Sequence, residues 1–475
     1  MSVDTNNAAF QDALNLIQYT RQSVFLTGKA GTGKSTFLRY VCENTKKKHV
    51  VLAPTGIAAI NAGGSTMHSF FKLPFYPLLP DDPNLSLQRG RIHEFFKYTK
   101  PHRKLLEQIE LVIIDEISMV RADIIDAIDR ILRVYSHNLR EPFGGKQLLL
   151  VGDVFQLEPV VKNDEREILN RFYPTPYFFS ARVFGQIDLV SIELQKVYRQ
   201  TDPVFVGVLD HIRNNTAGAA DLQLLNTRYG SQIEESEADM YITLATRRDT
   251  VDSINEKKLA ELPGDPITFE GVIEGDFPES SLPTSQELVL KPGAQIIFIK
   301  NDFDRRWVNG TIGVIAGIDE EEETIYVITD DGKECDVKRE SWRNIRYRYN
   351  EKTKEIEEEV LGSFTQYPIR LAWAITVHKS QGLTFSRVVI DFTGGVFAGG
   401  QAYVALSRCT SLDGIQLKKP INRADVFVRP EIVNFAGRFN DRQAIDKALK
   451  QAQADVQYAA ASRAFDKGDM EECLE

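Results

Sequence analysis

The sequence predicts an α/β protein built on two parallel-sheet units, and three observations carry this prediction. Short apolar runs alternate with segments of helical period in the first third of the chain, at residues 23–27, 49–54, 111–114 and 146–151. A glycine-rich loop follows the first of these runs. Two further apolar runs stand at residues 240–245 and 388–391. Buried strands that alternate with helices form a mostly parallel sheet covered on both faces.

The glycine-rich loop has the pattern of a phosphate-binding loop. Residues 28–36 read GKAGTGKST and fit G-x-x-x-x-G-K-[S/T] between a strand and a helix. We expect Lys34 to reach the β- and γ-phosphates of ATP and Ser35 to ligate Mg²⁺. A glycine-rich turn that carries a lysine by chance is the alternative, and the flanking strand and helix argue against it. The predicted nucleotide contacts in the loop are Gly28, Ala30, Gly31, Thr32, Gly33, Lys34, Ser35 and Thr36.

Composition is that of an ordinary soluble globular protein. The chain has 475 residues, of which 43% are hydrophobic and 26% charged, enough for several buried cores. The four cysteines form no C-x-x-C pair, so we expect no disulfide framework or zinc site and a reducing compartment. The sequence contains no apolar signal segment and no membrane-spanning run. We therefore expect an intracellular, cytoplasmic protein with no membrane partner.

The net charge of −10 argues against indiscriminate attraction to nucleic acid, because Lys and Arg supply most of that attraction. Nine of the carboxylates, however, lie in two clusters at residues 319–323 and 355–359, which can face away from a ligand. The charge is therefore compatible with a nucleic-acid groove elsewhere on the molecule.

Two carboxylates, Asp115 and Glu116, directly follow the third apolar run. The carboxyl end of a buried parallel strand opens toward the ligand site of such a sheet. We therefore expect Asp115 to orient Mg²⁺ and Glu116 to activate the attacking water. An Asp-Glu pair alone is common, and its position in a chain with a phosphate loop is what favours the catalytic interpretation.

Two glutamines are candidates for contacts with the nucleotide. Gln11 lies in an amphipathic segment at residues 7–19, and an amide can donate to and accept from an adenine edge at once. Gln156 follows the strand expected at residues 146–153, where an amide could sense whether a γ-phosphate is present. A surface glutamine and a structural turn glutamine are the respective alternatives.

Small and hydroxyl-bearing residues follow the second apolar run. Thr55 and Gly56 open a helix whose N–H groups can meet a phosphate backbone. Thr66, His68 and Ser69 add hydroxyls and an imidazole beside aromatic residues, a mixture suited to gripping single-stranded nucleic acid. A plain capped helix, with the aromatic residues in the core of a small subdomain, is the alternative.

The order of these patterns predicts the domain organisation. We expect a first domain at residues 1–185, with a small insertion at about 66–100, and a second at 186–430. Residues 290–365 alternate apolar and polar between turns, which is typical of a small antiparallel β-barrel inserted into the second unit. Residues 431–475 are expected to form a helical tail.

Together these motifs resemble the Pif-type (petite integration frequency) DNA helicases, in the RecD-related 5′-to-3′ branch of helicase superfamily one. The resemblance covers most of the chain and implies two RecA-like P-loop domains. The matching segments stand in family order at residues 28–36, 53–59 with 66–69, 115–118, 152–153 with 156–157, 197–200, 376–384 and 404–409.

The resemblance also implies roles for residues at the nucleotide. Gln11 looks like the adenine-contacting glutamine and Gln156 like the γ-phosphate sensor. Arg199 and Arg408 look like arginine fingers that stabilise charge on the transferred phosphoryl group. The apolar face of a helix at residues 401–408 would aim Arg408, whereas the sequence gives no such geometry for Arg199.

A second set of implied roles concerns DNA. By resemblance, His378 and Ser380 contact single-stranded DNA, while Gln381 and Gly382 link that contact to the nucleotide cleft. A helix-capping loop with a core histidine is the alternative for this segment.

The implied activity is that of an ATP-dependent DNA helicase that requires Mg²⁺ and translocates 5′ to 3′ on single-stranded DNA. The resemblance further implies a monomer that acts at duplex junctions, with G-quadruplexes and RNA–DNA hybrids as candidate substrates. Roles in DNA repair, replication, recombination and telomere maintenance follow, with nucleoid association in a bacterium. A translocase, a regulatory DNA-binding subunit without unwinding, and a nucleotide kinase are the alternatives.

Overall fold

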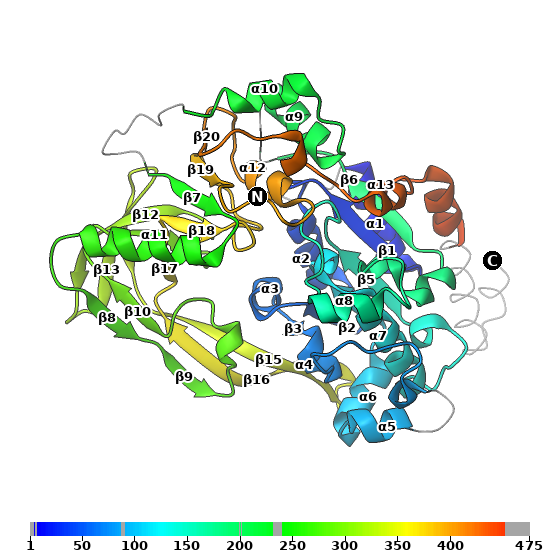
Figure 1. The fold of residues 1–475 in the computed structure, drawn as a ribbon. Helices are drawn as coiled ribbons and strands as arrows, with labels where there is room; N and C mark the ends of the chain where they lie inside the picture. The colour runs from blue at the N-terminus through cyan, green and yellow to red at the C-terminus, as the bar shows by residue number, and fades with distance from the viewer. Residues whose placement is uncertain are drawn as a thin grey trace.

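Two parallel sheets, one in each of two cores, organise the molecule (Figure 1). The computed structural model describes residues 4, 7–86, 91–198, 200, 202–230 and 240–451. The first core contains a six-stranded sheet in the order β3-β2-β4-β5-β1-β6, with every adjacent pair parallel. Its strands are β1 (Val24–Gly28), β2 (His49–Ala53), β3 (Ser65–Thr66), β4 (Leu111–Ile114), β5 (Gln147–Val151) and β6 (Val190–Leu194). The predicted α/β class with a parallel-sheet core is confirmed.

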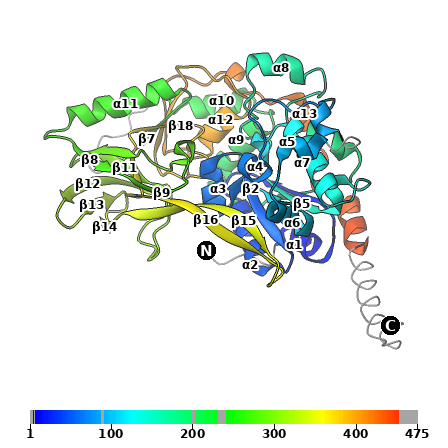
Figure 2. The same ribbon diagram turned by 90° about the horizontal axis from the view of Figure 1, so that it is seen from below.

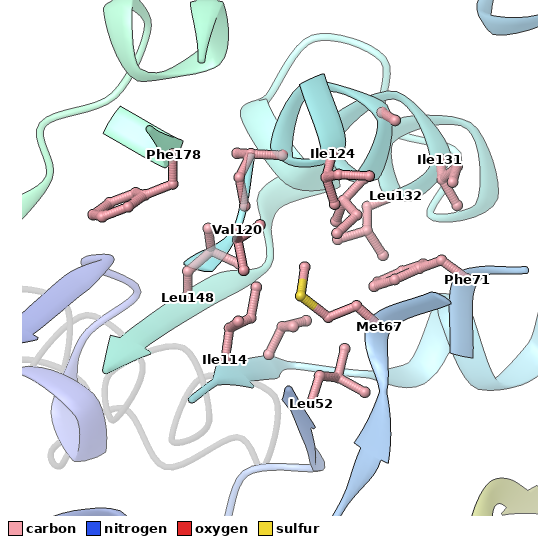
Figure 3. Close-up of a cluster of buried hydrophobic side chains, with 14 of the residues drawn as sticks. Leu52, Met67, Phe71, Ile114, Val120, Ile124, Ile131, Leu132, Leu148 and Phe178 are labelled. Carbon is pink, nitrogen blue, oxygen red and sulfur yellow. The ribbon is translucent and has the colours of Figure 1, made fainter. Parts of the chain in front are cut away.

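Helices cover both faces of this sheet, because successive strand residues point to opposite sides. The helices α1 (Ala8–Tyr19) and α2 (Lys34–Asn44) bury their apolar sides on one face. On the other face Leu52, Ile114 and Leu148 of the strands meet an isoleucine- and leucine-rich helix (Figure 3). The remaining helices of this core are α3 (Gly56–Ala62), α4 (Met67–Phe71), α5 (Arg91–Phe96), α6 (Lys100–Gln108), α7 (Ala122–Tyr135) and α8 (Asn163–Leu169).

The second core contains a four-stranded sheet in the order β18-β7-β19-β20, again parallel throughout. Its strands are β7 (Ile242–Ala245), β18 (Ala374–Thr376), β19 (Val388–Asp391) and β20 (Ile415–Leu417). Its helices are α9 (Pro203–Arg213), α10 (Ala219–Asn226), α11 (Arg248–Glu261) and α12 (Gln401–Leu406). None of the helices in the described ranges is long and apolar enough to cross a membrane.

The junction between the cores differs from the expected boundary between residues 185 and 186. Strand β6 (Val190–Leu194) belongs to the first sheet, where it pairs along its whole length with β1. The chain also returns to the first core after the second. Helix α13 (Pro430–Ala436) places Phe435 against Phe25 of β1, and Ile445 joins the hydrophobic cluster on the opposite face. Of the expected tail, residues 452–475 lie outside the described residues.

The insertion between β7 and β18 is antiparallel, as its alternating pattern predicts, but it is longer than residues 290–365. It forms a five-stranded sheet (β14-β13-β12-β11-β17), a pair (β10-β8) and a three-stranded sheet (β15-β16-β9). Closure into a barrel stays a prediction. The strands are β8 (Ile267–Glu270), β9 (Val272–Gly275), β10 (Glu287–Leu290), β11 (Gln295–Phe298), β12 (Ile312–Asp319), β13 (Thr324–Thr329), β14 (Glu334–Val337), β15 (Glu340–Asn350), β16 (Glu355–Gln366) and β17 (Ile369–Leu371).

The long hairpin of β15 and β16 leaves the rest of the insertion and extends along the first core (Figure 2). The hydroxyl of Tyr347 accepts a hydrogen bond from the backbone N–H of Val51 at 3.2 Å. Tyr347 and Tyr349 are buried with the hydrophobic cluster of the first core, and the Lys48 ammonium lies 5.5 Å from the Tyr349 ring centre. The hairpin therefore forms part of the wall of the first core.

Candidate functional site

The phosphate loop connects β1 to α2, and its carbonyl oxygens bind the ammonium of its own lysine. The Lys34 ammonium donates hydrogen bonds to the carbonyl oxygens of Gly28 at 2.6 Å and Lys29 at 3.0 Å. Gly33 has a φ of +92°, which an L side chain rarely adopts. A Cβ atom at Gly28 would lie 2.5 Å from the Thr32 hydroxyl. The curved loop thus holds a cation where the sequence predicts a phosphate.

The predicted carboxylate pair lies just beyond β4. Burial, and then the neighbouring Asp115 carboxylate, raise the pKa of Glu116 to about 7, while the charges of Lys34 and Arg408 oppose the shift. Burial also raises the pKa of Asp115. Glu116 has a left-handed φ of +51°, and its N–H donates to the Asp115 carboxylate at 2.9 Å. The left-handed turn keeps two half-buried carboxylates next to each other, near the positive charge of Lys34.

These groups have the chemistry that a nucleotide with Mg²⁺ requires. Mg²⁺ prefers carboxylate and hydroxyl oxygens, and Asp115 and Ser35 supply one of each. Ser35 is exposed in the first turn of α2, after the loop. A bound cation would also offset the mutual repulsion of Asp115 and Glu116.

The turn after β5 contains Gln156, which is 9% exposed. Its side-chain amide donates to the Asp153 carboxylate at 3.3 Å, and its backbone N–H donates to the Asp153 carbonyl at 3.0 Å. The turn is thereby held in one shape at the edge of the first core.

The second core contacts the phosphate loop directly. The hydroxyl of Tyr403, on α12, accepts a hydrogen bond from the N–H of Ala30 at 3.1 Å. The Lys29 ammonium pairs with the Asp210 carboxylate of α9 at 2.5 Å. Gly400, at the start of α12, has so little room that a Cβ would lie 2.1 Å from the Gln156 carbonyl oxygen. Sequence reasoning missed these three contacts, because each joins segments distant in the chain.

Arg408 follows the last turn of α12 and is 1% exposed. Its Nε donates to the Val404 carbonyl at 2.9 Å, and its Nη2 donates to the Ser407 hydroxyl at 3.0 Å. Its positive charge opposes the burial-driven rise in the pKa of Glu116. The helix ends at Leu406, two residues earlier than expected. Arg199, the other predicted arginine finger, lies outside the described residues.

Gln11 lies on α1, near the start of the described chain. Its backbone N–H donates to the carbonyl of Asn7, the residue that caps the helix. The Tyr198 hydroxyl donates to the Asp4 carboxylate at 2.8 Å, and the Tyr198 N–H donates to the Gly31 carbonyl. The segment before α1 is therefore tied to the phosphate loop through Tyr198. The adenine contact of Gln11 stays a prediction.

The residues of the first core that are candidates for DNA contact lie at or near the starts of two short helices. Thr55 caps α3 and Thr66 caps α4, each through its side-chain oxygen. His68 stacks on Phe75 with ring centres 5.1 Å apart and planes at 9°, and Phe75 is 84% exposed. Ser69 is exposed. Gly56 instead lies against Ser281 of the insertion, where a Cβ would meet the serine hydroxyl at 2.2 Å.

The candidate contacts of the second core differ in accessibility. His378 is half-buried, and burial lowers its pKa. Gly382 is exposed with a φ of +78°. Ser380, by contrast, is fully buried, and its hydroxyl donates to the Val377 carbonyl at 2.8 Å. The expected DNA contact of Ser380 does not fit this arrangement, because the hydroxyl is already satisfied inside the core.

A phosphate loop, a carboxylate pair and an arginine from a second parallel-sheet core define the class of two-core P-loop nucleoside triphosphatases. A family model described as PIF1-like helicase matches residues 4–212. The ATP-dependent DNA helicase Pif1 of Campylobacter jejuni is 33% identical over 83% of this chain and 88% of its own length. Human PIF1 is 32% identical over 83% of this chain and 58% of its own length.

Solved structures agree with these relatives. Pif1 from a Bacteroides species in complex with ADP-AlF4 is 41% identical, with a TM-score of 0.84 over 92% of this chain and 97% of its own. A Bacteroides Pif1 bound to single-stranded DNA gives a TM-score of 0.65 over 94% of this chain and 99% of its own. The chain belongs to the family of PIF1-like helicases, and its relatives are named as ATP-dependent DNA helicases.

Proposed function

We propose that this ATP-dependent DNA helicase moves 5′ to 3′ along single-stranded DNA as a monomer and separates duplexes at junctions. The observation that carries the proposal is the contact of the phosphate loop with the second core through Tyr403 and Asp210. A nucleotide bound at this loop can therefore alter how the two cores meet. Relatives with solved structures bound to single-stranded and forked DNA support the choice of DNA.

The nucleotide chemistry is assigned to residues of both cores. Lys34 binds the β- and γ-phosphates, Glu116 takes a proton from the attacking water, and Arg408 stabilises charge on the γ-phosphoryl oxygens. Asp115 and Ser35 would hold Mg²⁺, which when bound supplies charge neutralisation at the phosphates. Gln156 reports the γ-phosphate to the second core, Gln11 reads the adenine, and Arg199 is a second arginine finger.

The DNA path is assigned to residues of both cores as well. Thr55, Thr66 and Ser69 are proposed to hold phosphates, and His68 to meet the strand beside the exposed ring of Phe75. The second core contributes His378, which is half-buried and whose pKa is lowered by burial. We leave Ser380 out of this set because its hydroxyl is buried.

We also propose the domain assignment. Residues up to 194 form a first RecA-like domain with a small insertion, and residues 203–426 form a second with the antiparallel insertion. Alternating closure and opening of these domains would move DNA between their two sets of contacts. Because each duplex step holds about 1.4 kcal/mol of stacking energy, sustained unwinding requires coupling to ATP turnover.

The test is strand separation on two matched duplexes, one with a 5′ single-stranded tail and one with a 3′ tail. We expect ATP-dependent unwinding from the 5′ tail only, and loss of that activity in Lys34→Ala and on chelation of Mg²⁺. Unwinding from the 3′ tail would contradict the direction. DNA-stimulated ATP turnover without unwinding on either duplex would favour the alternative of a translocase or a partner-dependent subunit.

A further inference from the structure

Helix α9 of the second core contacts two separate parts of the first core. Its apolar residues Phe205, Leu209 and Ile212 are buried in the hydrophobic cluster of the second core. Asp210 and Arg213, one helical turn apart, both reach the first core. Asp210 pairs with Lys29 in the phosphate loop, and Arg213 reaches the turn that contains the predicted γ-phosphate sensor.

Arg213 is a buried, forked link between carboxylates. Its Nη2 lies 3.2 Å from the Asp153 carboxylate and its Nη1 lies 2.8 Å from the Glu193 carboxylate, while its side chain is 3% exposed. The guanidinium carbon lies 4.3 Å from the centre of the Phe155 ring. A planar guanidinium can span two carboxylates and an aromatic face at once, which a lysine ammonium cannot.

The Asp153 carboxylate contacts both Arg213 and Gln156. One oxygen of the Asp153 carboxylate binds Arg213 and the Phe155 N–H, and the other accepts the Gln156 side-chain amide. Leu157, the next residue, is buried in the hydrophobic cluster of the second core. The position of the Gln156 amide is therefore set from the second core through a single carboxylate.

The same second core carries the proposed DNA contact at His378. Val377, its neighbour, belongs to the hydrophobic cluster that also contains Phe205 and Leu209 of α9. A shift of the second core on DNA would thus move α9 as part of one packed body. We propose that α9 couples DNA binding to ATP turnover, with Arg213 as a positioning residue that aligns Gln156 through Asp153. This inference rests on the proposed function.

The test compares ATP turnover with and without saturating oligothymidylate in the full chain. In Arg213→Lys we expect DNA stimulation to fall roughly tenfold, within the range of ordinary coupling between two sites. ATP turnover without DNA and the KM for ATP should change less than about twofold, because the lysine keeps the positive charge. The lysine ammonium cannot, however, bind two carboxylates in the planar geometry of a guanidinium. His211→Gln is the matched control, since His211 lies on the exposed side of α9 and pairs with Asp221.

Further variants separate coupling from folding. Asp153→Asn should reduce stimulation as Arg213→Lys does, and the double variant should be no worse than either alone. If Arg213→Lys does not fold, Asp210→Asn replaces it in the test. Asp210 is partly exposed, so this variant is expected to fold. DNA stimulation of ATP turnover should also fall in Asp210→Asn.

Two results would overturn the inference. The first is a DNA stimulation of ATP turnover in folded Arg213→Lys that equals that of the wild-type chain. Where Arg213→Lys does not fold, the same result in Asp210→Asn would overturn the inference. The other is an equal loss of basal and stimulated turnover, which would indicate a structural role alone. Absence of DNA stimulation in the wild-type chain would instead refute the proposed function.

Discussion

The hydroxyl of Tyr403 meets the backbone N–H of Ala30 at 3.1 Å, and this bond joins the second core to the phosphate loop of the first. Tyr403 is buried, so the bond forms in a site of low dielectric, where an unpaired N–H is costly. The contact places one residue of α12 on the phosphate loop, while Arg408, two residues after the helix, opposes the burial-driven rise in the pKa of Glu116.

Tyr403→Phe removes this bond with little change of shape. We expect kcat/KM for ATP to fall roughly tenfold, which corresponds to the ~1–2 kcal/mol of a buried hydrogen bond. Steady-state ATP turnover measures the effect, and Tyr229→Phe, at a 52% exposed position, is the control. An unchanged kcat/KM would mean that the contact does not contribute during turnover.

Gly400→Ala tests the close approach of α12 to the sensor turn. A Cβ there would lie 2.1 Å from the Gln156 carbonyl oxygen and 2.3 Å from that of Phe155, so the cores could not meet as they do here. Gly395→Ala is a matched control. The backbone of Gly395 has a φ of +83°, close to the +80° of Gly400, but a Cβ at Gly395 would meet nothing within 4 Å.

Both glycine variants carry left-handed strain of roughly 1–2 kcal/mol, so similar losses of thermal stability are expected. DNA-stimulated ATP turnover should be lost in Gly400→Ala alone. Equal turnover in the two variants would show that this approach of the cores is not needed for hydrolysis.

Lys34→Ala and Glu116→Gln should separate binding from chemistry. Removing the ammonium should weaken binding of a fluorescent ATP analogue, because Lys34 is proposed to hold its phosphates. Glu116→Gln should leave binding within a few-fold but lower kcat by roughly 10²–10⁴, the usual contribution of a general base. Weak binding in Glu116→Gln, or normal turnover in either variant, would contradict these roles.

The hairpin contact predicts an effect on stability. The Tyr347 hydroxyl binds the N–H of Val51 in β2, beyond the two residue pairs that the short strand β3 makes with β2. Tyr347→Phe leaves that buried N–H unsatisfied, so the free energy of unfolding should fall by about 1–3 kcal/mol. Urea unfolding measures the loss, and Tyr326→Phe, at a 46% exposed position on β13, should lose little by comparison.

The sequence was most informative where the signal is local. The phosphate loop, the strand before Asp115 and the apolar run at residues 388–391 combine a clear period with a motif or turn at their ends, and each forms the expected element. The parallel cores follow from the alternation of such runs with helices. Of the four aromatic residues expected in the core of a small subdomain, Phe70 and Phe71 are buried, whereas Phe75 and Tyr76 are exposed.

Pairings between distant segments could not be predicted in the same way. Val190–Leu194 was expected to lie at the start of the second domain, but its pairing with β1 places it in the first core. The hairpin of β15 and β16 has the pattern of the insertion, yet Tyr347 packs on the first core. Only the folded chain brings these partners together.

Side-chain environments were also outside the reach of sequence. The Ser380 hydroxyl is buried and donates a hydrogen bond to the Val377 carbonyl. Nothing in the sequence distinguishes this serine from an exposed one that could touch DNA. Arg213 is the last residue of α9, and its partners Asp153 and Glu193 come from other elements of the chain.

Directional movement on single-stranded DNA is the central claim, and a translocation assay tests it most directly. The protein is bound to oligothymidylates of increasing length with a fluorophore at either end, and ATP is added with a trap for dissociated protein. We predict a lag that grows with length when the fluorophore is at the 3′ end, and none at the 5′ end. A growing lag at the 5′ end, or no lag at either end with ATP turnover intact, would contradict the account.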